Sequence, residues 1–201
     1  MALPRTVVMD GLLASMANLE ELLRSLDEAE WDKTSRCEGW TVGDVARHCV
    51  GSMASAAAGQ TDGLGTPEVT RREVDERAGR SAAQVADECA DVAAAVAALF
   101  PAFDDAAWAA PAPGGYEGTL GDGVEALWSD FWIHSDDIRA AVGRDPVADA
   151  GLPGAVSHVG FELGKRGWSG VVPAAPADQI PWLLAATGRA PAVEGLLNIY
   201  A

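Results

Sequence analysis

Residues 124–138 read VEALWSDFWIHSDDI, and this stretch decides the fold class. Its apolar side chains recur every three or four positions, which is the spacing that places them on one face of an α-helix. That face carries Val124, Leu127, Phe131, His134 and Ile138. The pattern therefore predicts an amphipathic helix with a histidine in its buried seam.

Three other segments have the same helical spacing. Before residue 31, the apolar stripe consists of Leu12, Met16, Leu19, Leu23 and Leu26. Thr41 and Asp44 have the spacing of an N-terminal capping box, which predicts the start of a second helix. Its inner side would carry Val42, Val45, Cys49 and Met53. Ser81 is expected to cap a third helix that ends at Pro101. The seam of that helix would be Val85, Cys89, Val92, Val96 and Leu99.

The segments between these helices differ in length. Residues 59–79 mix glycine, proline, threonine and charged residues without apolar periodicity, so we expect a long crossover loop there. A shorter helix is expected over residues 152–163, and residues 171–201 contain four prolines and one apolar patch. Together these features predict an all-α fold, a four-helix bundle with a long crossover loop, a short additional helix and a tail. We expect residues 1–170 to form one helical domain and residues 171–201 to pack on it as a short C-terminal extension.

The composition limits the classes of function. Of the 201 residues, 49% are hydrophobic and 22% are charged, which is ordinary for one globular domain. The net charge of −16 disfavours nucleic acid and anionic membrane surfaces as partners. No run approaches the roughly 20 apolar residues of a membrane span, and Asp10 interrupts the apolar stretch near the N-terminus, so we expect a cytoplasmic protein. Cys37, Cys49 and Cys89 form no Cys-x-x-Cys pair and are expected to be buried free thiols.

Two of the three histidines fall on inward positions of separate helices. His48 follows Val45 by three residues and shares its face, and His134 follows Asp130 by four, which stacks those two side chains. Two imidazoles and one carboxylate can hold a divalent ion with coordination positions left open, as in catalytic zinc and non-haem iron sites. We therefore predict that His48, Asp130 and His134 bind one metal ion. The third histidine, His158, has no carboxylate four residues away and is expected to be partly exposed.

Other interpretations of these residues remain open. Taken alone, His48 could be a core histidine with its hydrogen bonds satisfied, and Asp130 with His134 could be a surface ion pair. Asp44 precedes His48 by four residues and Asp137 follows His134 by three. Either carboxylate could orient an imidazole or replace Asp130 as ligand, and Asp137 is the stronger candidate of the two.

Three segments resemble the mycothiol-dependent maleylpyruvate isomerase family, which belongs to the DinB-like group of helical metalloproteins. They are CEGWTVGDVARH at residues 37–48, WIHSDDIRAAVG at 132–143 and LLAATGRAP at 183–191. The resemblance implies a DinB-like four-helix bundle that holds a zinc-type ion through a histidine on the second helix and a Glu-x-x-x-His pair on a later one. His48, Asp130 and His134 match these positions, with Asp130 in place of the family's glutamate.

The resemblance also implies an activity. The expected enzyme uses a divalent metal ion, Zn²⁺ or else Fe²⁺ or Ni²⁺, to activate the low-molecular-weight thiol mycothiol for isomerisation or thiol transfer on a small electrophilic substrate. We expect Asp137 to orient a ligand, and Arg139 or Arg189 to pair with a substrate carboxylate. A metal-dependent hydrolase of the same fold and a non-catalytic metal-binding or ligand-binding protein are the alternatives. The protein is expected to be a monomer or a homodimer.

Overall fold

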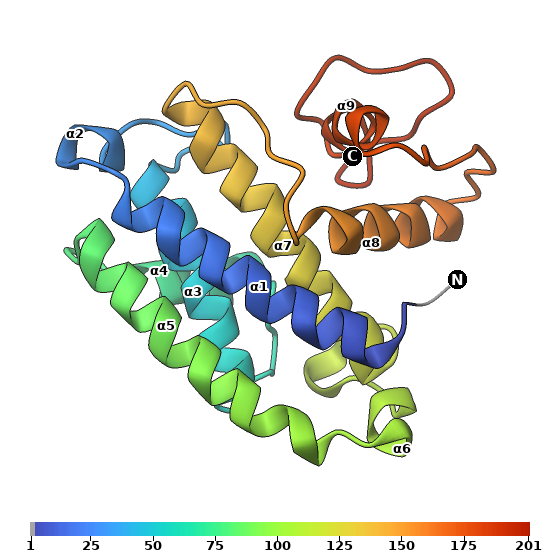
Figure 1. Ribbon diagram of the computed structural model, residues 1–201, viewed down its shortest axis with the longest axis horizontal. Coiled ribbons are helices and arrows are strands. Elements are labelled where there is room, and N and C mark those ends of the chain that lie inside the picture. The colour runs from blue at the N-terminus through green and yellow to red at the C-terminus, as the bar shows by residue number, and fades with distance from the viewer. Residues whose placement is uncertain (1–2) are drawn as a thin grey trace.

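The computed structural model describes residues 3–201, and every regular element within that range is a helix. The four longest are α1 (Arg5–Arg24), α3 (Val42–Ala57), α5 (Ala82–Leu99) and α7 (Leu120–Ala141). Helices α1 and α3 each pack against both α5 and α7, which closes a four-helix bundle with α1 diagonally opposite α3 (Figure 1). The predicted all-α bundle is confirmed. In the described part of the chain, no helix is both long and apolar enough to cross a membrane.

Capping boxes start three of the four bundle helices. The side chains of Thr41, Ser81 and Thr119 each accept a hydrogen bond from the backbone N–H three residues later. In return, the side chain at that later position accepts one from the N–H of the cap residue, which satisfies donors that a helix end leaves unpaired. The predicted caps at Thr41 and Ser81 are confirmed. The Thr119 box starts α7 four residues before Val124, the first residue of the quoted stretch.

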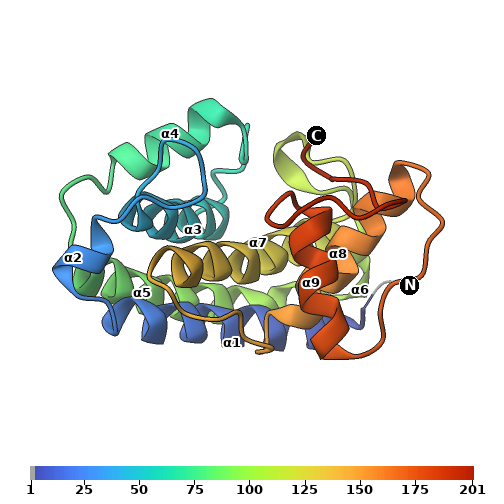
Figure 2. The same ribbon diagram turned by 90° about the horizontal axis from the view of Figure 1, so that it is seen from above.

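The expected crossover loop is wrong in part, because it contains the helix α4 (Pro67–Asp75). Thr66 caps this helix and Pro67 occupies its first turn, where the missing N–H of proline has no helical partner to lose. Its buried residues are Val69, Glu73 and Val74, and the helix packs on α3 (Figure 2). The sequence prediction depended on apolar periodicity. This nine-residue helix lacks it, because it is rich in charged residues and one of its buried positions is a glutamate.

The remaining helices pack at the edges of the bundle. They are α2 (Glu28–Trp31), α6 (Asp105–Ala109), α8 (Leu152–Lys165) and α9 (Pro176–Ala186). Helix α8 lies against α7, and α9 lies on α8 (Figures 1 and 2). A second hydrophobic cluster joins these three helices to the C-terminal segment. Its buried members are Trp132, Ile133, Leu152, Ala155, Val159, Leu163, Leu183, Ala186 and Ile199.

The indole of Trp128 on α7 sets how closely α1 and α8 approach. A Cβ atom at Gly11 of α1 would lie 2.1 Å from the Trp128 ring, and one at Gly154 of α8 would lie 2.3 Å from it. The indole N–H donates a hydrogen bond to Ser15 Oγ at 2.9 Å. The three helices therefore meet on one aromatic ring, and glycine is required at both contact points.

Candidate metal centre

Helices α3 and α7 lie side by side and bring together the three predicted metal ligands. Asp130 Oδ2 lies 3.2 Å from Nε2 of His48, and Asp130 Oδ1 lies 3.3 Å from Nε2 of His134. One ligand atom from each of the three residues lies within 4.8 Å of the other two. We call these three residues the His–Asp–His cluster. Their proximity is a finding, and their role as metal ligands stays a prediction.

The bundle orients both imidazoles. His48 follows the buried Val45 by three residues and is itself buried, and the edge of Trp40 packs on its ring with centroids 5.3 Å apart. The rings of His48 and His134 are nearly perpendicular, with centroids 5.1 Å apart. His134 lies one turn after Asp130 on α7, as its spacing predicts. Both Nε2 atoms therefore face the same carboxylate.

Asp137 holds His134 by its other ring nitrogen. The imidazole Nδ1 and Asp137 Oδ2 are 2.8 Å apart, and the Asp137 side chain is fully buried. Burial alone would raise the pKa of Asp137, but hydrogen bonds from His134 and Arg189 outweigh it and hold that pKa far below its usual range. An ionised carboxylate only accepts hydrogen bonds, so Nδ1 of His134 carries the proton. Asp137 therefore contacts the ring nitrogen of His134 that faces away from Asp130, and its orienting role stays a prediction.

Two arginines fix Asp137 in turn. Arg189, which follows α9, donates from Nε to Oδ1 at 2.8 Å and from Nη2 to Oδ2 at 2.7 Å. Arg36, from the loop before α3, bridges Asp137 and the neighbouring Asp136. Segments far apart in the sequence thus converge behind His134. Arg36 has no local sequence signal, because its partners Asp136 and Asp137 lie 100 and 101 residues away.

The other ring nitrogen of His48 also has a partner. Its Nδ1 lies 3.2 Å from Oγ of Ser52, which donates a hydrogen bond to Glu73 Oε2 at 3.0 Å. Ser52 and Glu73 were not among the predicted site residues. Ser52 is one turn after His48 and could have been found by spacing, whereas Glu73 lies in the segment predicted to be a loop.

The residues of the cluster shift one another's pKa values. Burial would lower the pKa of His134, but the charge and hydrogen bond of Asp130, followed by the hydrogen bond of Asp137, hold it well above its usual value. Burial would raise the pKa of Asp130, but His134 and then His48 hold it well below its usual value. A positive charge between these side chains is therefore favoured, whether a proton or a metal ion supplies it.

The donor set fits a divalent metal ion. Metal–nitrogen and metal–oxygen bonds of about 2.0–2.1 Å at tetrahedral angles place neighbouring ligand atoms about 3.3 Å apart. The contacts from Asp130 to the two imidazoles have this length, one through each carboxylate oxygen: Oδ2 lies 3.2 Å from His48 Nε2 and Oδ1 lies 3.3 Å from His134 Nε2. The side chain of Asp130 is 30% exposed, so solvent can reach the cluster at this residue. Three ligands leave a coordination position open for a small molecule.

The three cysteines differ in their surroundings. Cys49 and Cys89 are buried and Cys37 is partly buried, and all three are free thiols. Burial raises the pKa of Cys89 to about 12. Cys37 donates from Sγ to Asp137 Oδ2 at 3.3 Å and lies 3.9 Å from Nδ1 of His134. Cys37 is therefore the thiol that contacts His134 and Asp137, and composition alone does not distinguish it from the other two.

The remaining candidate residues have partners outside the His–Asp–His cluster. Arg139 faces away from the cluster and pairs with Asp149 at 3.7 Å, so the structure does not bring it to the site. The Nε and Nη2 donors of Arg189 bind Asp137, so its guanidinium acts on the protein rather than standing free. Asp44 caps α3 with Thr41 and does not contact His48. His158 is partly exposed, as expected.

Comparison with known proteins identifies the family and the fold of this chain. The family described as Mycothiol maleylpyruvate isomerase N-terminal domain matches residues 12–139. A crystal structure of the mycothiol-dependent maleylpyruvate isomerase has a TM-score of 0.57 and 17% sequence identity, covering 85% of this chain and 75% of that chain. A histidine-to-alanine mutant of that enzyme gives a TM-score of 0.57 and 18% identity with the same coverage. No curated protein sequence matches the chain. At this identity the solved structures show a shared fold, whereas the family match spans more than half of the sequence, and the chain therefore belongs to the mycothiol maleylpyruvate isomerase N-terminal domain family.

Proposed function

We propose that this protein is a metal-dependent enzyme that activates a low-molecular-weight thiol, mycothiol, for reaction with a small electrophilic substrate. His48, Asp130 and His134 would hold the metal ion, with Zn²⁺ as the first choice and Fe²⁺ or Ni²⁺ as alternatives. The observation that carries the proposal is that each histidine is bonded through Nδ1 to a partner outside the cluster while both Nε2 atoms face Asp130. Imidazoles that bind metal ions are held in this way.

The roles of the protein's own residues follow from their contacts. A divalent ion held here would supply Lewis-acid chemistry that lowers the pKa of a thiol or water bound to it. Asp137 holds the proton on His134 Nδ1, so the neutral ring has its lone pair on Nε2, the atom that would bind the ion. Trp40 packs against the ring of His48 in an edge-to-face arrangement, which helps to fix the orientation of that ring. The partly exposed Asp130 side chain marks the side from which a thiol and a substrate would enter.

Thiol activation fits the cluster better than hydrolysis does. A metal-dependent hydrolase also needs a general base near the attacking water. Asp137 is the other carboxylate that touches the cluster residues, and it already accepts hydrogen bonds from His134, Cys37, Arg36 and Arg189. Its depressed pKa makes it a weak base. The contacts of Asp137 therefore favour an orienting role.

The experiment that tests the proposal is isothermal titration calorimetry of mycothiol into zinc-loaded and metal-free protein. We expect saturable binding to the zinc-loaded form alone, and its loss with mycothiol whose sulfur is methylated. That matched ligand keeps the rest of the molecule and removes only the thiolate. Equal binding of both ligands to both protein forms would reject thiol activation and would favour a non-catalytic binding protein.

A further inference from the structure

A chain of hydrogen bonds runs from His48 to a fully buried carboxylate. His48 Nδ1 lies 3.2 Å from Ser52 Oγ, and Ser52 donates to Glu73 Oε2 at 3.0 Å. Ser55 donates to the other carboxylate oxygen, Glu73 Oε1, at 2.6 Å. His48, Ser52 and Ser55 form one stripe along α3, because they are four and three residues apart. Glu73 comes from α4 and faces this stripe.

The direction of these hydrogen bonds determines the tautomer of His48. A hydroxyl group has one proton, and Ser52 donates it to Glu73, so Ser52 can only accept from the imidazole. Nδ1 of His48 must then carry its proton. In a neutral imidazole the lone pair is left on Nε2, the atom that lies 3.2 Å from Asp130. The tautomer that can bind a metal ion is thus set from outside the His–Asp–His cluster.

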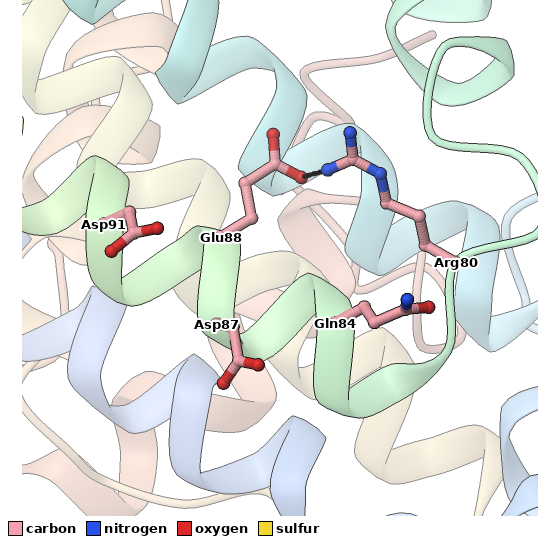
Figure 3. Close-up of a pocket in the computed structure, with 5 residues that line it drawn as sticks. All are labelled: Arg80, Gln84, Asp87, Glu88 and Asp91. Atoms are coloured by element: carbon pink, nitrogen blue, oxygen red, sulfur yellow. Dashed lines mark hydrogen bonds and ion pairs between the residues drawn. The ribbon is translucent and has the colours of Figure 1, made fainter.

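Several contacts anchor Glu73 in this position. Arg77 donates to the Glu73 backbone carbonyl at 2.9 Å and pairs through Nη2 with Glu88 of α5 at 2.8 Å. Arg80 binds the same Glu88 carboxylate, at the edge of a surface pocket on α5 (Figure 3). A Cβ atom at Gly51 would lie 2.8 Å from that of Glu73, so the glycine allows α4 to approach α3 closely. The C-terminal end of α4 is therefore tied to both α3 and α5.

A structural role alone does not explain this glutamate. A buried carboxylate costs free energy unless it is paired, and the Glu73 carboxylate accepts its hydrogen bonds from two hydroxyl groups rather than from a cation. A neutral side chain of similar size would pack in the same space without that cost. What the carboxylate does in this position is fix the hydroxyl group of Ser52, which lies between it and the imidazole of His48.

We propose that Glu73, acting through Ser52, is a positioning residue that keeps the proton of His48 on Nδ1 and so directs Nε2 toward the metal centre. The inference rests on the proposed function, because it concerns how this protein prepares one of its three ligands. Through Glu73, helix α4 would contribute to the site, although the sequence predicted this segment to be a loop.

The test compares Ser52→Ala and Glu73→Gln with the matched control Ser55→Ala. The control removes a hydroxyl group from the same carboxylate but does not touch His48. Zinc affinity is measured by competition with a chromogenic chelator. The His48 Nδ1–H proton is followed by NMR in the zinc-loaded protein, where its hydrogen bond to Ser52 slows exchange with water. Glu73→Gln preserves side-chain volume and probes the same link if Ser52→Ala disturbs folding.

We expect Ser52→Ala and Glu73→Gln to weaken zinc binding by about 10–100-fold, as loss of a hydrogen-bond partner behind a metal-bound histidine does. The slowly exchanging Nδ1–H signal should disappear in Ser52→Ala and persist in Ser55→Ala. Equal zinc affinity in Ser52→Ala, Glu73→Gln and Ser55→Ala would overturn the inference and leave the proposed function standing. Failure of the wild-type protein to bind zinc, Fe²⁺ or Ni²⁺ would overturn the proposed function itself and the inference with it.

Discussion

The carboxylate of Asp130 lies between two imidazole nitrogens, and its length is the main residue-level departure from the related family. The resemblance places a glutamate here, whereas aspartate is one methylene shorter. The structure nevertheless puts both Asp130 oxygens 3.2–3.3 Å from the Nε2 atoms. The shorter side chain therefore reaches both imidazoles, because α3 and α7 pack closely at this level.

Asp130→Asn tests whether this carboxylate is a ligand. Loss of a residue that only hydrogen-bonds to a metal ligand weakens metal binding by about 10–100-fold. We expect the loss of a ligand itself to lower zinc affinity by at least as much. Asp44→Asn is the matched control, since Asp44 also precedes a histidine by four residues but bonds to Thr41 at the start of α3. Chelator competition measures both variants. Equal affinity in the two would show that Asp130 is not a ligand.

Arg189→Ala tests the buried ion pair behind His134. The Asp137 carboxylate is fully buried, and in this variant it keeps Arg36 as its one arginine partner. We therefore expect the free energy of unfolding to fall by about 3 kcal/mol. The pKa of Asp137 is depressed in the folded protein. This contribution is therefore complete above about pH 4, the pKa of an unfolded aspartate, and is lost as the pH falls toward the depressed value.

Urea denaturation measures this effect, with Arg72→Ala as the control. Arg72 pairs with Glu76 on the exposed face of α4, where both side chains are more than half exposed, so its removal should cost less than about 1 kcal/mol. Similar destabilisation in the two variants would contradict the view that Arg189 is a structural support of the site.

The elements show where sequence reasoning succeeds. Helices α1, α3, α5 and α7 each bury a regular apolar seam, which is a local pattern, and three have capping boxes that mark their first residues. Helix α4 lacks such a seam because its buried face includes Glu73. The same distinction holds within the site. The spacing of Asp130 and His134 is visible in one helix, whereas Arg36, Glu73 and Arg189 reach their partners only through the tertiary fold.

The packing of α1, α7 and α8 on Trp128 predicts opposite effects for two substitutions in one helix. Gly154→Ala would force a methyl group against the indole and should destabilise the protein by about 1–3 kcal/mol. In Gly164→Ala the new methyl group meets nothing within 4 Å, so the better helix former should stabilise α8 by about 0.5–1 kcal/mol. Thermal unfolding distinguishes the two. Equal shifts in melting temperature would contradict this packing.

At the scale of the whole molecule, the C-terminal segment connects to the site. We propose that residues 171–201 form an extension that packs on the helical domain rather than an independent unit. The segment supplies Leu183, Ala186 and Ile199 to the second hydrophobic cluster. It also supplies Arg189 to the carboxylate behind His134. The C-terminal segment therefore contributes to the stability of the fold and to the orientation of the predicted ligand His134.

Truncation after residue 170 tests this organisation. The truncated protein would expose the apolar surface of α8 that α9 covers, so we expect a lower melting temperature and a tendency to aggregate. Circular dichroism and light scattering report these changes. A truncated chain that melts at the wild-type temperature and stays monodisperse would show that the extension does not pack on the domain.

The central claim is that one divalent metal ion is held by His48, Asp130 and His134. The most direct measurement is the metal content of protein purified without a histidine tag, by inductively coupled plasma mass spectrometry. The wild type is compared with His48→Ala, His134→Ala and the control His158→Ala, which removes the histidine outside the cluster. We predict close to one zinc, iron or nickel ion per chain in the wild type and the control, and its loss in the other two variants. A wild-type protein that stays free of metal after incubation with all three ions would contradict the claim.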